Sequence, residues 1–237
     1  MNIQIPFKEK CRDFWSLNNT LKNEIKDKPI IKITKGEERF NIKEKCFQCY
    51  NFDTTMEIEP EDIKEKNISL IFQTKKIEIK DNDVCSIFSF VKDDEVKLSI
   101  DLEQYGEYFY INSSKKISQN ETDTVIPINV LSQDNWSTNV FIFDYENKQI
   151  RYYINSVLVY MINIETLVDM RMSSLYFNRD LSCNGSIRNI GVYNCTFSYD
   201  DIKKLSYHNY YKKLTTSLWI KFIEFLFKNR KEMIPWI

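Results

Sequence analysis

Short runs of β-branched and aromatic residues, each closed by turn residues, fill the stretch from Asn135 to Leu205. One run is residues 137–144, and two more, 150–154 and 157–160, flank the pair Asn155-Ser156. Runs of this length and composition are typical of β-strands, and Asn, Asp, Ser and Gly between them favour tight turns. The stretch therefore predicts a succession of short strands.

The first half of the chain carries the same pattern. Strands are predicted at residues 29–34, 54–60, 67–72, 76–79, 84–91, 96–102 and 105–112, with turns at 81–83 and 92–95. About eleven to thirteen short strands with no helix between them favour an all-β, antiparallel sandwich. The 237 residues, 43% of them hydrophobic, suffice for one sizeable core.

Fifteen residues of the 135–205 stretch resemble, in order, the second half of a laminin-G-like, concanavalin-A-like jelly roll. The matching positions are Trp136, Asp144, Tyr153, Asn155, Gly185, Ile187, Ile190, Val192, Tyr193, Asn194, Phe197, Ser198, Asp201, Ile202 and Leu205. Ser156 departs from the family pattern, which has Gly there, so a longer turn or another turn type is expected. The resemblance implies a concanavalin-A-like jelly roll, a fold that carries lectins, glucanases, adhesion modules and scaffolding domains.

An N-terminal helical arm is predicted over residues 1–28, ahead of a sandwich over 29–197. Cys11, Phe14, Leu17, Leu21 and Ile25 recur at spacings of three and four, which is the pattern of an amphipathic helix. Asp27-Lys28-Pro29 would end this helix. Its apolar stripe either packs on the surface of the domain or docks on a partner.

The C-terminal segment, residues 198–237, is predicted to be helical. Ser198 can cap a first helix that continues through Tyr210 and Tyr211. Residues 214–227 then form an apolar stretch whose only charged members are Lys221 and Glu224, so a helix there is apolar nearly all round. Fourteen such residues are too few to cross a bilayer. The stretch packs on its own sandwich, docks into a partner, or lies at a membrane interface.

Six cysteines are present, and a chain of this size does not need disulfides. Cys46 and Cys49 have the CxxC spacing, but no second CxxC or pair of histidines lies nearby to complete a zinc site. No helical pattern follows them, which disfavours a redox site. Reduced structural thiols are the favoured interpretation, with metal binding or pairing of these two cysteines left open.

Catalytic patterns are sparse. His208 is the one histidine, and a chain with four glycines has no Gly-rich phosphate loop. Glu57-Ile-Glu-Pro-Glu61 approaches the acidic motif of concanavalin-A-like glucanases, in which alternate carboxylates share one face of a strand. Pro60 interrupts that strand, and Met56 and Ile58 are expected to point inward. We expect no enzyme activity, no catalytic residues and no cofactor.

The charge is balanced, with 33 basic and 34 acidic residues, which disfavours nucleic acid as a partner. Rim loops of lectin relatives bind calcium through Asp and Asn, and the residues of that type here are Asp81, Asn82, Asp83, Asp93, Asp94 and Asp144. Because turn residues look the same, no metal site is assigned.

The favoured function is a non-catalytic scaffolding subunit of a larger intracellular assembly, because the chain opens with no signal peptide and carries no transmembrane span. It would dock on other subunits, and in part on a membrane surface, through the N-terminal arm and the C-terminal helix. The docking residues expected are Trp15, Leu218, Trp219, Phe222, Ile223, Phe225, Leu226, Phe227 and Trp236. The alternative is a carbohydrate-binding module, with or without calcium, and a degenerate glycoside hydrolase is less favoured.

Overall fold

The computed structural model describes residues 3–27, 31–49, 53–59, 67–79, 84–103, 109–113, 135–164, 173–181 and 183–208. Within these ranges the first strands are β1 (Cys11–Trp15), β2 (Ile31–Lys35), β3 (Phe40–Asn41), β4 (Cys46–Cys49), β5 (Thr55–Ile58), β6 (Asn67–Ile79) and β7 (Val84–Lys92). They are followed by β8 (Glu95–Glu103), β9 (Phe109–Ser113), β10 (Ser137–Asp144), β11 (Gln149–Ile154), β12 (Val157–Asn163), β13 (Ser174–Phe177), β14 (Cys183–Tyr193) and the helix α1 (Tyr199–Ser206).

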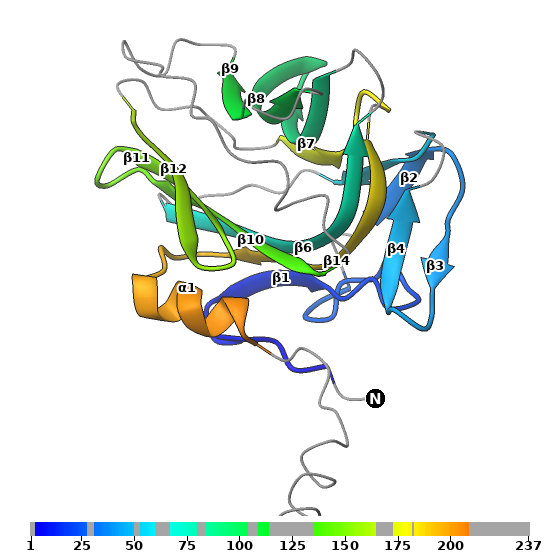
Figure 1. Ribbon diagram of the computed structural model, residues 1–237, viewed down its shortest axis with the longest axis horizontal. Coiled ribbons are helices and arrows are strands. Elements are labelled where there is room, and N and C mark those ends of the chain that lie inside the picture. The colour runs from blue at the N-terminus through cyan, green and yellow to red at the C-terminus, as the bar shows by residue number, and fades with distance from the viewer. Residues whose placement is uncertain are drawn as a thin grey trace, which may run out of the picture.

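Two antiparallel sheets make up the fold (Figure 1). The first holds eight strands in the order β12-β11-β10-β6-β14-β4-β3, with β1 paired to β14 beside this path. The second holds six strands in the order β2-β5-β13-β7-β8-β9. Central partners such as β6 and β14 lie far apart in the sequence. The all-β antiparallel sandwich expected from the sequence is confirmed.

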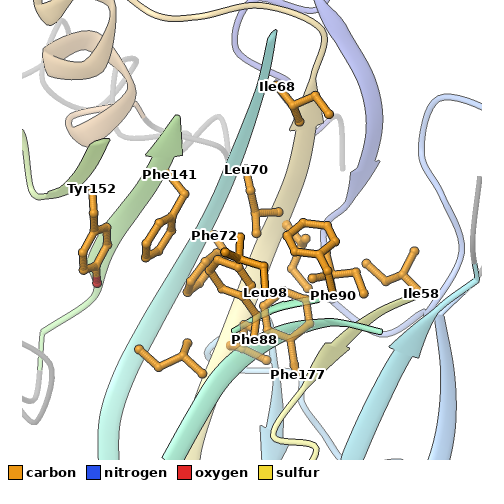
Figure 2. Close-up of a cluster of buried hydrophobic side chains, with 14 of the residues drawn as sticks. Ile58, Ile68, Leu70, Phe72, Phe88, Phe90, Leu98, Phe141, Tyr152 and Phe177 are labelled. Atoms are coloured by element: carbon orange, nitrogen blue, oxygen red, sulfur yellow. The ribbon is translucent and has the colours of Figure 1, made fainter. Parts of the chain in front are cut away.

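Aromatic side chains from both sheets fill the space between them. Phe72 of β6 stacks on Phe141 of β10 with ring centroids 6.2 Å apart, and it meets Phe88 of β7 edge-on at 6.0 Å. Figure 2 shows these rings gathered with Phe177 and Leu98 in one cluster. Because each fully buried side chain of this kind contributes about 1.5–3 kcal/mol, this core is the main source of stability.

The N-terminal segment is a strand in the sandwich, and the predicted helical arm is wrong. β1 pairs with β14 through the partners Phe14↔Gly191 and Trp15↔Ile190. Phe14 and Trp15 are consecutive, yet they are buried in different clusters on opposite faces of the sheet. Successive side chains alternate in this way along a strand and not along a helix. The helical spacing of the apolar residues was therefore coincidental.

The β11–β12 hairpin turns tightly in spite of Ser156. Asn155 and Ser156 both have positive φ, at 49° and 68°, which is the conformation of a two-residue type I′ turn. Asn155 is held from the neighbouring strand, because Thr138 N donates to Asn155 Oδ1 at 2.9 Å and Asn155 N donates to Thr138 O at 2.9 Å. The expectation of a longer or different turn is wrong, since these contacts fix the turn without glycine.

The helix α1 covers part of the outer face of the eight-stranded sheet (Figure 1). Its buried residues, Ile202 and Leu205, join a second apolar cluster that includes Val140, Ile142 and Tyr153. Ser198 caps the helix as predicted, with its hydroxyl accepting from Asp201 N at 3.2 Å. The helix ends at Ser206, before the expected Tyr210, because the residues that face the sheet end at Leu205.

The apolar stretch 214–227 lies outside the described residues. Within the described part of the chain, no helix has the length and apolar character needed to cross a membrane.

Candidate functional site

A polar ladder crosses the outer face of the six-stranded sheet. Leu175 and Phe177 of β13 point into the core, so strand alternation turns Tyr176 to the opposite face. Tyr176 pairs with Glu57 of β5 on one side and with Ser89 of β7 on the other. The side of the sheet away from the core therefore carries hydroxyl and carboxylate groups at its centre.

A surface pocket of about 420 Å³ opens beside Tyr176. Its polar lining residues are Thr34, Lys35, Thr55, Asp94, Tyr176, Arg179 and Asp180. Pockets of 300–1,000 Å³ are the usual size for a small ligand. The wall combines an aromatic ring with side chains that donate and accept hydrogen bonds, which is a chemistry suited to a polyhydroxylated ligand.

The turn that carries Arg179 and Asp180 is fixed by Asn178. This residue is buried and has a φ of 54°, a left-handed conformation that Asn tolerates better than most residues. Its Nδ2 donates to Thr54 O at 2.9 Å and to Cys183 O at 3.0 Å, and its Oδ1 accepts from Cys183 N at 2.8 Å. Cys183 is itself disulfide-bonded. Arg179 and Asp180 are thus presented by a preorganised turn.

Asp180 is connected to a second set of hydrogen bonds on β7 and β8. Its Oδ2 accepts from Ser86 N at 3.2 Å. The Ser86 hydroxyl donates to Asp101 Oδ1 at 2.6 Å, and the Ser99 hydroxyl donates to Asp101 Oδ2 at 2.9 Å. These contacts hold the Asp180 carboxylate in place at the edge of the pocket.

Tyr176 remains a neutral hydrogen-bonding group. Burial raises the pKa of its phenol, and the adjacent Glu57 carboxylate raises that pKa further. The Ser174 hydroxyl donates to Glu57 Oε1 at 2.8 Å, which fixes the carboxylate beside the ring. At neutral pH the phenol is therefore protonated, and its oxygen can accept a hydrogen bond from a ligand.

Two cationic side chains of the pocket have hydrogen-bond donors available for a ligand. Among the described residues, the side chains of Arg179 and Lys35 have no hydrogen bond and no ion pair, whereas the Lys32 side chain nearby pairs with Glu59. A guanidinium offers five donors in a fixed fork. A ligand that enters beside Tyr176 would meet these donors without displacing a protein partner.

Among the described residues, the carboxylates considered for catalysis or calcium do not converge on a common site, and Asp81, Asn82 and Asp83 lie outside the described residues. Met56 and Ile58 point inward as expected, which turns Glu57 and Glu59 outward, where they bond to Ser174 and Lys32. Glu61 lies outside the described residues. The Asp144 carboxylate accepts hydrogen bonds from Asn147 Nδ2 at 3.0 Å and from the Arg151 guanidinium at 3.1 Å. In the described part of the chain, no group of three or more His, Cys, Asp or Glu is arranged to hold a metal ion.

The remaining predicted residues are dispersed. The His208 ring lies 3.0 Å from Gln4 O. Cys11, Cys46 and Cys195 are free thiols, and burial raises the pKa of each, that of Cys11 to about 12. The expectation that all thiols are reduced is wrong for Cys183, which is disulfide-bonded.

The expected docking residue Trp15 is unavailable to a partner. It is fully buried in the main core, where it faces the space between the sheets from β1. The other docking residues, Leu218, Trp219, Phe222, Ile223, Phe225, Leu226, Phe227 and Trp236, lie outside the described residues.

Sequence reasoning missed the pocket. The alternation in Ser174-Leu-Tyr-Phe177 was a usable signal, because two buried apolar residues place Tyr176 on the outer face. Arg179 and Asp180 gave no such signal, since a polar pair after a strand is the ordinary composition of a turn. Only the pairing of β13 with β5 and β7 brings these residues together with Lys35 and Asp94.

Comparison with known proteins gives a structural likeness without a sequence family. No protein-family model matches the chain, and no curated protein sequence matches it either. A binding domain of botulinum neurotoxin DC, solved in complex with rat synaptotagmin II, superposes with a TM-score of 0.65 at 15% identity, over 84% of this chain and 51% of that one. A second structure of such a domain, in complex with SialylT, gives a TM-score of 0.63 at 16% identity, over 82% and 50%.

A structure of botulinum neurotoxin type C is also similar, with a TM-score of 0.62 at 15% identity, over 84% of this chain and 51% of that one. Cell entry of that toxin depends on interaction with two ganglioside molecules. The chain spans about half the length of these domains. At such identity the likeness shows a shared fold. The expectation of an intracellular scaffolding subunit is wrong, because these similar solved structures are binding domains of botulinum neurotoxins.

Proposed function

We propose that this chain is a non-catalytic recognition domain that binds a carbohydrate in the pocket beside Tyr176. The arrangement of Tyr176 and Arg179 carries the proposal. The neutral phenol of Tyr176 lines one polar pocket together with the Arg179 guanidinium, which has no hydrogen-bond or ion-pair partner among the described residues and is presented by the turn that Asn178 fixes. The structural neighbours that bind SialylT, gangliosides and synaptotagmin II support a recognition role for this fold. The finer fold proposed is the concanavalin-A-like jelly roll implied by the family resemblance.

The proposed setting is outside the cytosol. Cys183 is disulfide-bonded, and disulfides persist in oxidising environments such as the cell exterior. Receptor recognition by the structural neighbours is consistent with such a setting.

A glycan array probed with the labelled full chain tests the proposal. We expect a saccharide to bind equally with calcium and with a chelator, because the described residues form no metal site. In titrations with that saccharide, Arg179→Ala and Tyr176→Ala should each weaken binding at least about tenfold, since a hydrogen bond to a charged group contributes about 1.5–3 kcal/mol.

Matched controls exist on α1 and at its end. Lys203→Ala and Tyr207→Ala remove an exposed cation and a phenol that is 76% exposed, both away from the pocket, and should leave affinity unchanged. Binding that survives both pocket substitutions would contradict the pocket assignment. An array with no saccharide bound would contradict the carbohydrate function itself.

A further inference from the structure

Strand β12 lies at one edge of the eight-stranded sheet (Figure 1). Two apolar side chains on its outer face, Leu158 and Met161, are 45% and 53% exposed, and we call them the β12 patch. No charged residue and no proline occurs from Val157 to Asn163. Sheet edges of soluble proteins are normally protected by charges or prolines, or are covered by another segment. The β12 edge has neither protecting residue, so we expect it to be covered.

The β12 patch continues an apolar cluster that α1 already covers in part. Leu158 is directly opposite Tyr153, which is buried with Ile202 and Leu205 of α1. Met161 is directly opposite Arg151 on the same face. A segment that covers the patch would therefore extend an existing buried surface and remove more apolar area from water, which is favourable.

One unsatisfied donor borders the β12 patch. Arg151 uses one amino group to bond Asp144 at 3.1 Å, but its buried Nε has no partner among the described residues. Buried donors without an acceptor are rare and destabilise the protein. An occupant that is apolar but carries a carboxylate fits this surface.

We propose that residues 214–227 of the same chain cover the β12 patch. This stretch contains twelve apolar or small residues around Lys221 and Glu224, and it begins six residues after His208, the last described residue. Six residues span up to about 20 Å. Because α1 packs on β10 and adjacent strands are about 4.8 Å apart, β12 lies about 10 Å to the side, within reach.

The dimensions and charges of the two elements agree. As a helix, fourteen residues would extend about 21 Å. The seven residues of β12 extend about 23 Å. Glu224 supplies the single carboxylate of the stretch for the Arg151 donor, and the apolar side chains cover Leu158 and Met161.

Hydrogen–deuterium exchange on the full chain tests this docking. In the wild type, the amides of residues 214–227 should exchange at least about tenfold more slowly than unstructured amides. In the double variant Leu158→Asp, Met161→Asp they should return to within about twofold of the unstructured rate, because aspartate on the patch repels an apolar cover. Reciprocally, Trp219→Asp with Phe222→Asp should raise the exchange of amides in β12.

The matched control is Ile42→Asp, which changes an apolar residue that is 75% exposed beside β3, at the opposite end of the strand order. Slow exchange in β6 and β10 verifies that each variant is folded. Unprotected amides at 214–227 in the wild type would overturn the proposal, as would protection that the double variant leaves unchanged. Protection that falls on dilution would identify a second copy of the chain as the cover and would equally overturn it.

Discussion

Asn178 and Cys183 are joined by two hydrogen bonds that close the turn between β13 and β14. Asn178 Nδ2 donates to Cys183 O at 3.0 Å, and Cys183 N donates to Asn178 Oδ1 at 2.8 Å. The turn between them carries Arg179 and Asp180 into the pocket. The geometry of the candidate site is therefore set by a residue that does not line it.

Replacing Asn178 tests this dependence. Asn178→Ala leaves Cys183 N, Cys183 O and Thr54 O without their partner and places Ala at a positive φ. We expect the free energy of unfolding to fall by about 2–4 kcal/mol in urea titrations. The control Asn163→Ala, on the exposed side of β12, should change it by less than about 0.5 kcal/mol. Equal losses in the two variants would contradict the structural role of Asn178.

The β11–β12 turn predicts a stabilising substitution. Ser156 has a φ of 68°, which costs a residue other than glycine about 1 kcal/mol. Ser156→Gly should therefore raise the free energy of unfolding by about 0.5–1 kcal/mol, as measured by thermal or urea unfolding. Asn155→Gly is the contrasting variant, because it loses the bond from Thr138 N and should not stabilise. A destabilised Ser156→Gly protein would show that the turn has another conformation.

The disulfide at Cys183 predicts sensitivity to reductant. Reduction should lower the urea midpoint, with a loss of about 2–5 kcal/mol, because the unfolded chain regains conformational freedom. Cys183→Ser should show the same loss without reductant and no further loss with it. The free cysteine variant Cys195→Ser should respond to reductant like the wild type. No response of the wild type would contradict the disulfide.

The N-terminus of α1 predicts a stability change at acid pH. The Ser198 hydroxyl holds the pKa of Asp201 below its ordinary value of 3.8. A carboxylate whose pKa is lowered by folding stabilises the protein above its unfolded pKa, and this contribution is lost as pH falls through the folded pKa. Asp201→Asn should therefore be less stable than the wild type at pH 7 by a few tenths of a kcal/mol, the size of an exposed cap contact.

The difference in the free energy of unfolding between Asp201→Asn and the wild type should disappear as the pH falls below about 3.8. In a Ser198→Ala background the same substitution should have a smaller effect at pH 7, because the hydroxyl is gone. Urea titrations at both pH values measure the difference. A gap that persists at low pH would show that the carboxylate charge is not responsible.

The sequence by itself determined the class of fold. The runs of β-branched and aromatic residues at 84–91 and 96–102 predicted β7 and β8, and Lys92-Asp-Asp-Glu95 predicted the turn between them, where Asp93 and Asp94 have positive φ. Ser198 likewise predicted the start of α1. These features depend on local residue preferences and on side-chain periodicity, which a reader of the sequence can see directly.

Only the tertiary structure decided the rest. The apolar residues near the N-terminus satisfy a helical spacing and still form β1, because β14 offers backbone partners and two faces on which to bury Phe14 and Trp15. The candidate site joins Lys35, Asp94, Tyr176 and Arg179 from strands and turns that are distant in sequence. Such a meeting depends on which strands pair, and strand pairing is a long-range property that local preference does not specify.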